Sequence, residues 1–134
     1  GLAQINKLNH FIKKRRENFK FLKENLINLQ DHIILPTQEK DSDPSWFGFP
    51  ITLKKNVDKI KFVNYLNEAN IETRQVFGGN ILKQPGFKNI DYRLSGNLDG
   101  TNFIMENTIF FGVYPGLTNE MLEYVLEKIQ RFFK

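Results

Sequence analysis

One run of eight residues, Thr73–Asn80, combines side chains that can recognise a charged, ring-containing ligand. The run follows a predicted strand and holds an arginine, an aromatic ring, two adjacent glycines and an amide. An arginine offers a planar cation for phosphate or carboxylate, and paired glycines let the backbone approach a ligand closely. The candidate substrate contacts are Arg74, Phe77, Gly78, Gly79 and Asn80.

A plainer interpretation of the same run stays open. Adjacent glycines after a strand are more often just a turn, and a strand arginine often forms a surface ion pair. The rings of Phe77 and Trp46 can stack on a ligand, but aromatic side chains at strand positions more often pack against the protein itself. Asn80 can donate to a sugar hydroxyl or simply close the turn. Weaker candidates for ligand contacts are Arg93, Tyr114 and Gly116.

Catalytic chemistry is not indicated by any pattern in this chain. It contains no Ser/His/Asp arrangement, phosphate-binding glycine loop, dinucleotide fingerprint or zinc pattern. Without cysteine, and with two isolated histidines, it is not expected to form disulfides, ligate an iron–sulfur cluster or hold a metal. No lysine stands in the apolar context that a Schiff-base lysine needs. The sequence therefore predicts binding groups, but no catalytic, cofactor-binding or metal-ligating residue.

The length of 134 residues suits one domain with a single hydrophobic core. No apolar run reaches the 18 residues of a membrane span, so no membrane contact is predicted. Gly1 leads directly into helical periodicity without an initiator methionine or leader, so we expect a domain excised from a longer protein. The lack of cysteine is compatible with a cytoplasmic location.

Positive charge is concentrated at the start of the chain, where residues 1–30 hold seven basic and two acidic side chains. Such a run can bind nucleic acid, although it is more often the solvated face of a helix. A small basic nucleic-acid-binding module is therefore an alternative function from a different class. The basic residues are Lys7, Lys13, Lys14, Arg15, Arg16, Lys20 and Lys23.

Hydrophobic periodicity predicts the elements that position the candidate residues. Apolar side chains spaced by three and four residues predict one long helix from Leu2 to about residue 30, followed by a surface connection over residues 31–45. Residues 46–53 read as a strand, in which Pro50 favours an edge position or a bulge. Asn56 is the predicted N-cap of a helix that reaches Ala69, and Asn70 suits the left-handed residue after it.

The second half of the chain alternates strands with helices around an irregular segment. We predict a strand over 71–76, an irregular segment over 81–100 and a short helix capped by Thr101. A strand over 108–113 is apolar enough to be buried on both faces, and Thr118 caps the final helix. This order predicts an α/β two-layer sandwich: a small, mainly antiparallel or mixed sheet with helices on one face.

Six segments of the chain form a distinctive combination: Gly1–Ile5, Ser45–Pro50, Thr73–Arg74, Phe77–Asn80, Gln84–Pro85 and Gly112–Thr118. Together they resemble a known family, the DegT/DnrJ/EryC1/StrS pyridoxal-phosphate sugar aminotransferases. The helix start is general to that family. The aromatic and glycine-rich segments are more particular to its CDP-4-keto-6-deoxyglucose 3-dehydrases, which serve lipopolysaccharide and O-antigen synthesis.

The resemblance implies the C-terminal part of a fold-type-I aminotransferase. Residues 1–30 would be an interdomain helix and residues 31–134 the small C-terminal domain. The large domain, absent from this chain, would hold the PLP or PMP cofactor and any iron–sulfur cluster. The parent would be a homodimer that acts on a CDP-linked 4-keto-6-deoxy sugar and works with a reductase partner. The resemblance leaves open whether the reaction is a dehydration or an amination. This chain alone would be inactive and would supply Arg74 and Phe77–Asn80 to the substrate site.

Overall fold

Four short strands form one antiparallel sheet in the computed structural model, which describes residues 1–134. They are β1 (Ile33–Ile34), β2 (Gly48–Leu53), β3 (Arg74–Gln75) and β4 (Thr108–Gly112), and they lie in the order β1-β2-β4-β3. The longest pairing joins β2 to β4 and places Phe49 opposite Phe111. The predicted sandwich is confirmed, and its sheet is antiparallel throughout.

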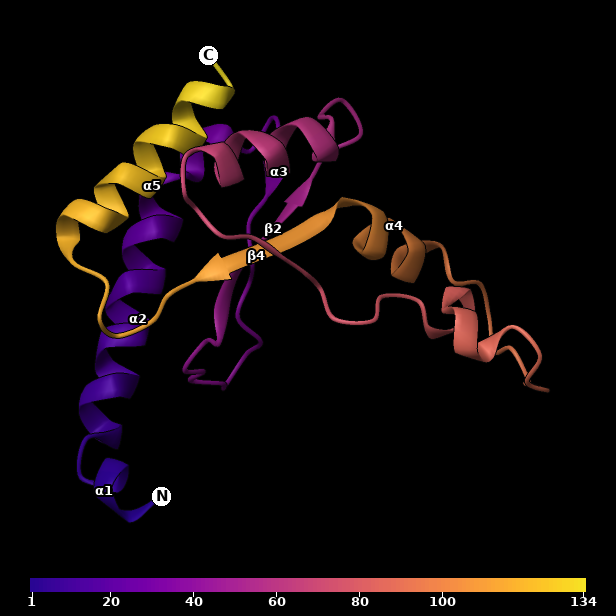
Figure 1. Cartoon of the computed structure of the whole chain (residues 1–134), viewed down its shortest axis with the longest axis horizontal. Coiled ribbons are helices and arrows are strands. Elements are labelled where there is room, and N and C mark those ends of the chain that lie inside the picture. Colours follow the sequence, from indigo (N-terminus) through magenta and orange to yellow (C-terminus); the bar gives the residue numbers. More distant parts are fainter.

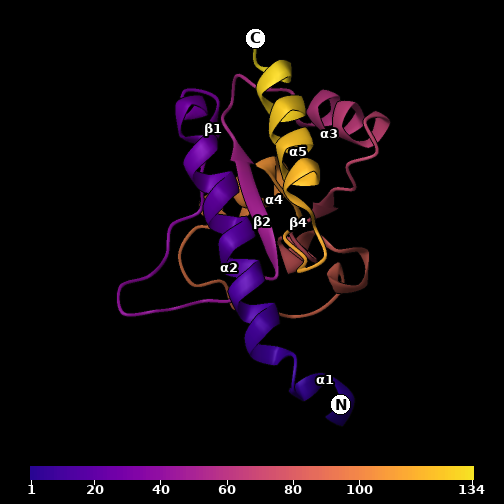
Figure 2. The same cartoon turned by 90° about the vertical axis from the view of Figure 1, so that its left-hand side faces the viewer.

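Three helices cover one face of this sheet: α2 (Leu8–Asn25), α3 (Lys59–Glu68) and α5 (Asn119–Phe132) (Figure 2). Strands β1, β2 and β4 turn apolar side chains toward these helices, whose apolar stripes complete one core. A fourth helix, α4 (Asp99–Asn107), runs directly into β4 and lies outside this helical layer (Figure 1). Core residues with no exposed surface include Leu22, Leu26, Phe49, Ile51, Phe62, Leu66, Ile109 and Ile129.

The opposite face of the sheet is only partly covered. Phe110 of β4 is half-buried there, and its ring centroid lies 5.8 Å from that of Phe47 and 6.0 Å from that of Phe77. Gly112, two residues later on the same face, is exposed. The prediction that this strand is buried on both faces is therefore wrong at its end, because no helix covers that side.

The apolar spacing predicts one continuous N-terminal helix, but the structure divides this helix into pieces. It is divided into α1 (Leu2–Ile5), α2 and a 3-10 turn, η1 (Ile27–Leu29), with a break before α2. Leu2, Ile5 and Leu8 are half or more exposed because α1 and the start of α2 project beyond the sheet (Figure 2). Periodicity alone cannot detect this break, since the apolar stripe continues across it.

Two predicted helix starts are wrong, and two other predicted termini are confirmed. The Asp58 carboxylate, not Asn56, caps α3 by accepting from the backbone N–H groups of Ile60 and Lys61. The short helix α4 begins before the predicted cap Thr101. Thr118 does cap α5, and Asn70 has the expected left-handed φ of 58°.

The strands differ more from expectation than the helices do. β1 lies inside the predicted surface connection, and β3 contains only two of the six residues predicted as a strand. Pro50 is on an inner strand instead of an edge strand, but β1 pairs only with Leu53 and Thr52, so β2 has a single neighbour at Pro50. Each helix is too short or too polar to span a lipid bilayer.

Candidate functional site

The loop that follows β3 has a strained backbone at Phe77. This residue has a φ of +42°, and its N–H donates to the Gln75 carbonyl at 2.8 Å. A left-handed conformation is rare for an aromatic residue and costs about 1–3 kcal/mol, and such residues cluster at ligand sites. The Phe77 side chain is 82% exposed, so its ring is available to a ligand.

Gly79 is required by the packing of the same loop on α4. Its φ is +59°, and a Cβ at this position would overlap the side chain of Met105. The next residue, Asn80, donates its backbone N–H to the Met105 sulfur at 3.3 Å. Gly78 has open space around it, so only one of the two adjacent glycines is needed for packing.

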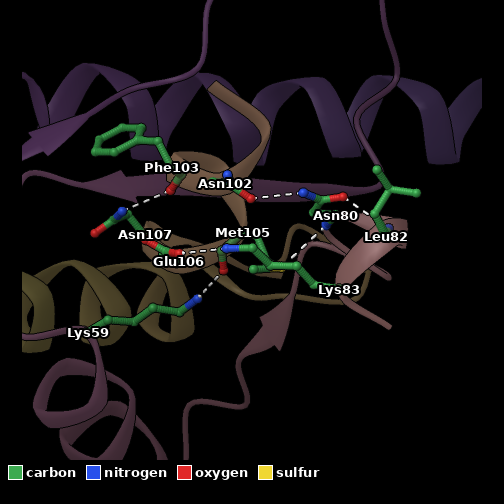
Figure 3. Close-up of polar contacts among 9 residues, drawn as sticks. All are labelled: Lys59, Asn80, Leu82, Lys83, Asn102, Phe103, Met105, Glu106 and Asn107. Atoms are coloured by element: carbon green, nitrogen blue, oxygen red, sulfur yellow. Dashed lines mark hydrogen bonds and ion pairs between the residues drawn. The ribbon is translucent and has the colours of Figure 1, made fainter. Parts of the chain in front are cut away.

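The Asn80 side chain belongs to an internal network, shown in Figure 3. It is 4% exposed, its amide nitrogen donates to Asn102 Oδ1 at 2.9 Å, and its oxygen accepts from the Leu82 N–H at 3.0 Å. The amide therefore caps the 3-10 turn η2 (Ile81–Lys83) and ties the loop to α4. A direct substrate contact by Asn80 stays a prediction.

Lys59 holds α3, β3 and α4 together beside this loop (Figure 3). Its Nζ donates to Gln75 Oε1 at 2.7 Å and to the Met105 carbonyl at 3.0 Å. Burial lowers the pKa of Lys59, and the charge of Glu106 opposes that shift. Glu106 also pairs with Lys83 at 3.2 Å, which joins η2 to the end of α4.

Lys59 is expected to make stability depend on pH. Burial disfavours its ammonium form, so the folded chain binds this proton less tightly than the unfolded chain. The contribution of Lys59 to the free energy of unfolding therefore rises as the pH increases from the lowered folded-state pKa toward the ordinary lysine value of 10.5, and it is lost as the pH falls. The free energy of unfolding of the wild type, minus that of Lys59→Met, should increase over this interval in denaturant titrations.

The matched control is Lys61→Met, which removes a lysine from the same helix whose side chain is 79% exposed. Subtracting the free energy of unfolding of Lys59→Met from that of Lys61→Met at each pH cancels the titration of the other lysines and tyrosines. A Lys59 difference that stays flat or decreases with pH would contradict the assignment.

Arg74 lies on a different part of the surface of the molecule from Gly78 and Gly79. It is opposite Phe110 in the sheet and forms an exposed ion pair with Glu72 at 2.5 Å. Because β3 is only two residues long, the chain before it does not pair with the end of β4. A cleft of about 680 Å³ lies there, lined by the segment 70–72, the end of β4 and the first turns of α5. We call this the β4 cleft.

The β4 cleft also contains residues that were not candidates, or only weak ones. Arg15 of α2 reaches into it and donates Nη1 to the carbonyls of Trp46 and Phe47 at 3.3 and 3.0 Å. Tyr114 lines it as well, and the buried Asn18 donates to the Tyr114 carbonyl at 3.0 Å. Arg15 had been assigned only to the basic face of the helix, because no periodic signal separates it from its neighbours.

The structure thus divides the predicted site into two parts that meet at Phe110. Arg74 lines the β4 cleft, whereas Gly78, Gly79 and Asn80 lie over α4; the Phe77 ring contacts Phe110, which also lines the cleft. Trp46, the second ring considered for stacking on a ligand, stacks on Phe19 with ring centroids 4.6 Å apart. Of the weaker candidates, Gly116 leaves room for the Tyr114 ring, and Arg93 is exposed on the 88–98 segment.

Comparison with known sequences identifies the family. The sequence model described as the DegT/DnrJ/EryC1/StrS aminotransferase family matches residues 1–130. The chain belongs to this family. Within it, the chain is 46% identical to the lipopolysaccharide biosynthesis protein RfbH of Salmonella typhimurium, over 99% of the chain and 31% of that protein.

Two further relatives of this DegT-family chain carry more specific names. A dTDP-4-dehydro-2,6-dideoxy-D-glucose 3-dehydratase of Saccharopolyspora spinosa is 40% identical over 98% of the chain and 29% of its own length. The solved E. coli GDP-4-keto-6-deoxy-D-mannose-3-dehydratase with bound hydrated PLP superimposes with a TM-score of 0.83 at 29% identity, covering 95% of this chain and 33% of that one. The chain spans about a third of the length of these relatives.

Proposed function

We propose that this chain is the C-terminal part of a PLP- or PMP-dependent nucleotide-sugar 3-dehydrase, with CDP-4-keto-6-deoxyglucose as the substrate. The observation that carries the proposal is the 46% identity to RfbH over 99% of the chain, supported by 40% identity to a dTDP-linked 3-dehydratase. In this proposal residues 1–30 connect the two domains and residues 31–134 form the small domain. The product would enter lipopolysaccharide synthesis in the cytoplasm.

The residues of this chain would form one wall of the substrate site. Arg74 would pair with an anionic group of the substrate, and the Phe77–Asn80 loop would contact the sugar. The exposed ring and strained backbone of Phe77 support this role, since the strain is maintained by a loop held firmly on α4.

We propose that no residue of this chain binds the cofactor. The lysine with a lowered pKa, Lys59, donates its amine to Gln75 and to the Met105 carbonyl, so it is not free to form a Schiff base. We therefore assign cofactor binding to the rest of the parent protein, together with any iron–sulfur cluster, a reductase partner and the contacts of a homodimer. On this basis the chain alone is inactive.

The alternative of a nucleic-acid-binding module has little support from the basic helix. Lys13, Lys14 and Lys20 pair with glutamates of the same helix, and Arg16 pairs with Asp43 at 2.9 Å. Arg15 is bonded to backbone carbonyls, as described above. Affinity for single-stranded RNA that falls steeply with salt would restore this alternative.

The deciding experiment gives the parent protein PMP, CDP-4-keto-6-deoxyglucose and the proposed reductase partner with its electron donor, and follows the sugar by mass spectrometry and NMR. The proposal expects loss of the C3 hydroxyl, whereas an aminotransferase of the same family, supplied with PLP and an amino donor, would place an amine on C4. The 134-residue chain alone is the control and should leave the sugar unchanged. An intact C3 hydroxyl after incubation with CDP-, GDP- and dTDP-linked 4-keto sugars would refute the dehydrase assignment.

A further inference from the structure

Met105 of α4 holds the Phe77–Asn80 loop through its thioether sulfur (Figure 3). The sulfur Sδ accepts the Asn80 backbone N–H at 3.3 Å, and no oxygen atom bonds this N–H. The loop also packs against the same side chain, because a Cβ added to Gly79 would lie 2.9 Å from Sδ. One sulfur atom therefore acts as hydrogen-bond acceptor and as packing surface for two consecutive loop residues.

The contact between Met105 and the loop is incompatible with an oxygen atom on the sulfur. Oxidation of methionine gives a polar, chiral sulfoxide. In one epimer the oxygen lies between Sδ and the Asn80 N–H, where 3.3 Å leaves no room for it, so the loop must move away. In the other epimer the lone pair that faces the N–H belongs to a sulfur with partial positive charge, which is a poor acceptor. The N–H of Asn80, a residue that is 4% exposed, then loses its partner.

The backbone of this loop depends on the contacts that hold it in place. Phe77 has a φ of +42° and Gly79 a φ of +59°. Strained conformations such as that of Phe77 persist only where the surrounding structure fixes them. Without the Met105 contact, the Asn80–Asn102 hydrogen bond of 2.9 Å is the remaining polar contact between the loop and α4. Oxidation of Met105 should therefore allow the loop to leave its present position.

Met105 lies where a small oxidant can reach it. The residue is half-buried and lines a pocket of about 320 Å³ between α3, β3 and α4, together with Lys59, Gln75 and Glu106. A peroxide molecule is far smaller than this pocket. The other methionine of the chain, Met121, is 52% exposed on α5 and lines the β4 cleft instead. Met121 therefore provides an internal comparison.

We propose that Met105 is a redox-sensitive modification site, at which oxidation by hydrogen peroxide releases the Phe77–Asn80 loop from α4. A lone pair of Sδ attacks one peroxide oxygen, and the S–O bond forms as the O–O bond breaks. The proton of the transferred oxygen passes to the leaving oxygen, which departs as water, so the thioether loses the two electrons that the peroxide gains. A dithiol-dependent methionine sulfoxide reductase reverses the step, since the oxygen leaves as water while the two thiols become a disulfide.

The test treats the Met121→Leu chain with hydrogen peroxide, so that Met105 is the only methionine left. Leucine and methionine are similar in volume, so this variant should fold. Peptide mass spectrometry verifies the added oxygen on Met105. We expect Tm to fall by about 3 °C or more and the amide NMR signals of Gly79, Asn80 and Asn102 to move. Sulfoxide reductases for both epimers, supplied with a dithiol, should restore the Tm and the signals.

The matched control is the Met105→Leu chain, in which peroxide can oxidise only Met121. Its Tm should change by less than about 1 °C on oxidation, and its loop signals should stay in place. Comparing each variant with its own unoxidised form removes the effect of the substitution itself. Unchanged Asn80 and Asn102 signals in the oxidised Met121→Leu chain overturn the proposal. Resistance of Met105 to peroxide that fully oxidises Met121 in the wild type overturns it as well.

The parent protein separates this inference from the proposed function. Release of the loop is independent of that function, and only its effect on substrate binding rests on it. KM for the nucleotide sugar should rise at least about fivefold after peroxide treatment of the wild-type parent, and less than about twofold in its Met105→Leu variant. An equal rise in both proteins overturns the effect on substrate binding, while dehydration of the sugar still supports the proposed function. If the loop signals respond to oxidation but the untreated parent leaves the sugar unchanged, only the proposed function fails.

Discussion

Replacing Gly79 with valine is expected to lower the free energy of unfolding by about 2–5 kcal/mol and to detach the loop from α4. A left-handed φ costs a residue with a Cβ about 1–2 kcal/mol. The added side chain also collides with Met105, and overpacking of this kind costs about 1–3 kcal/mol more. Urea denaturation measures the total, and amide shifts of Asn80 and Asn102 report the loop itself.

The adjacent glycine is the matched control for this prediction. Gly78 has no atom within 4 Å of an added Cβ and lacks a left-handed φ, so Gly78→Ala should change stability by less than about 0.5 kcal/mol. Combining Gly79→Val with Met105→Ala should restore the stability lost through the collision with Met105, but not the stability lost through the left-handed φ. Equal stability of the Gly78 and Gly79 variants would show that the loop does not depend on the packing of Gly79 against Met105.

Phe62→Ala is expected to cost about 3–5 kcal/mol, a large fraction of the stability of a domain, which is typically about 5–15 kcal/mol. The Phe62 side chain has no exposed surface, and its ring packs 4.9 Å from Phe132 and 5.5 Å from Phe133. Truncation leaves a cavity between α3 and α5, because the surrounding helices cannot collapse fully into it. Chemical denaturation of the 134-residue chain measures the loss.

Ile60→Ala on the same helix separates burial from helix propensity. Ile60 is 73% exposed, so its truncation should change stability by less than about 0.5 kcal/mol. A Phe62→Ala cost below about 1 kcal/mol would mean that α3 does not pack on α5 in solution as described.

Contacts between distant elements connect the Phe77–Asn80 loop to α4 and to the β4 cleft. The loop is held by contacts to α4, and α4 in turn is held by Lys59, which donates to the Met105 carbonyl at 3.0 Å. Phe110 connects this loop with the β4 cleft through its contact with Phe77. A substitution in α4 can therefore disturb the Phe77–Asn80 loop without changing any residue of that loop.

Local sequence determined helices α3 and α5, the fold class and the family. Contacts at three and four residues lie on one helix face, so α3 and α5 follow from spacing, and the Thr118 cap and Asn70 terminus follow from the chemistry of single residues. The glycine and aromatic segments identified the family because such local combinations are particular to it, which the match to residues 1–130 confirms.

Only the tertiary structure decided the short strands and the arrangement of the site. β1 and β3 have two residues each and exist through hydrogen bonds to distant partners, which no local spacing reveals. The same long-range packing buries the Asn80 amide against Asn102 and brings Arg15 of α2 beside Gly112 of β4. The candidate loop was visible in the sequence, but the β4 cleft was not, because its residues are assembled by strand pairing and by helices far apart in the chain.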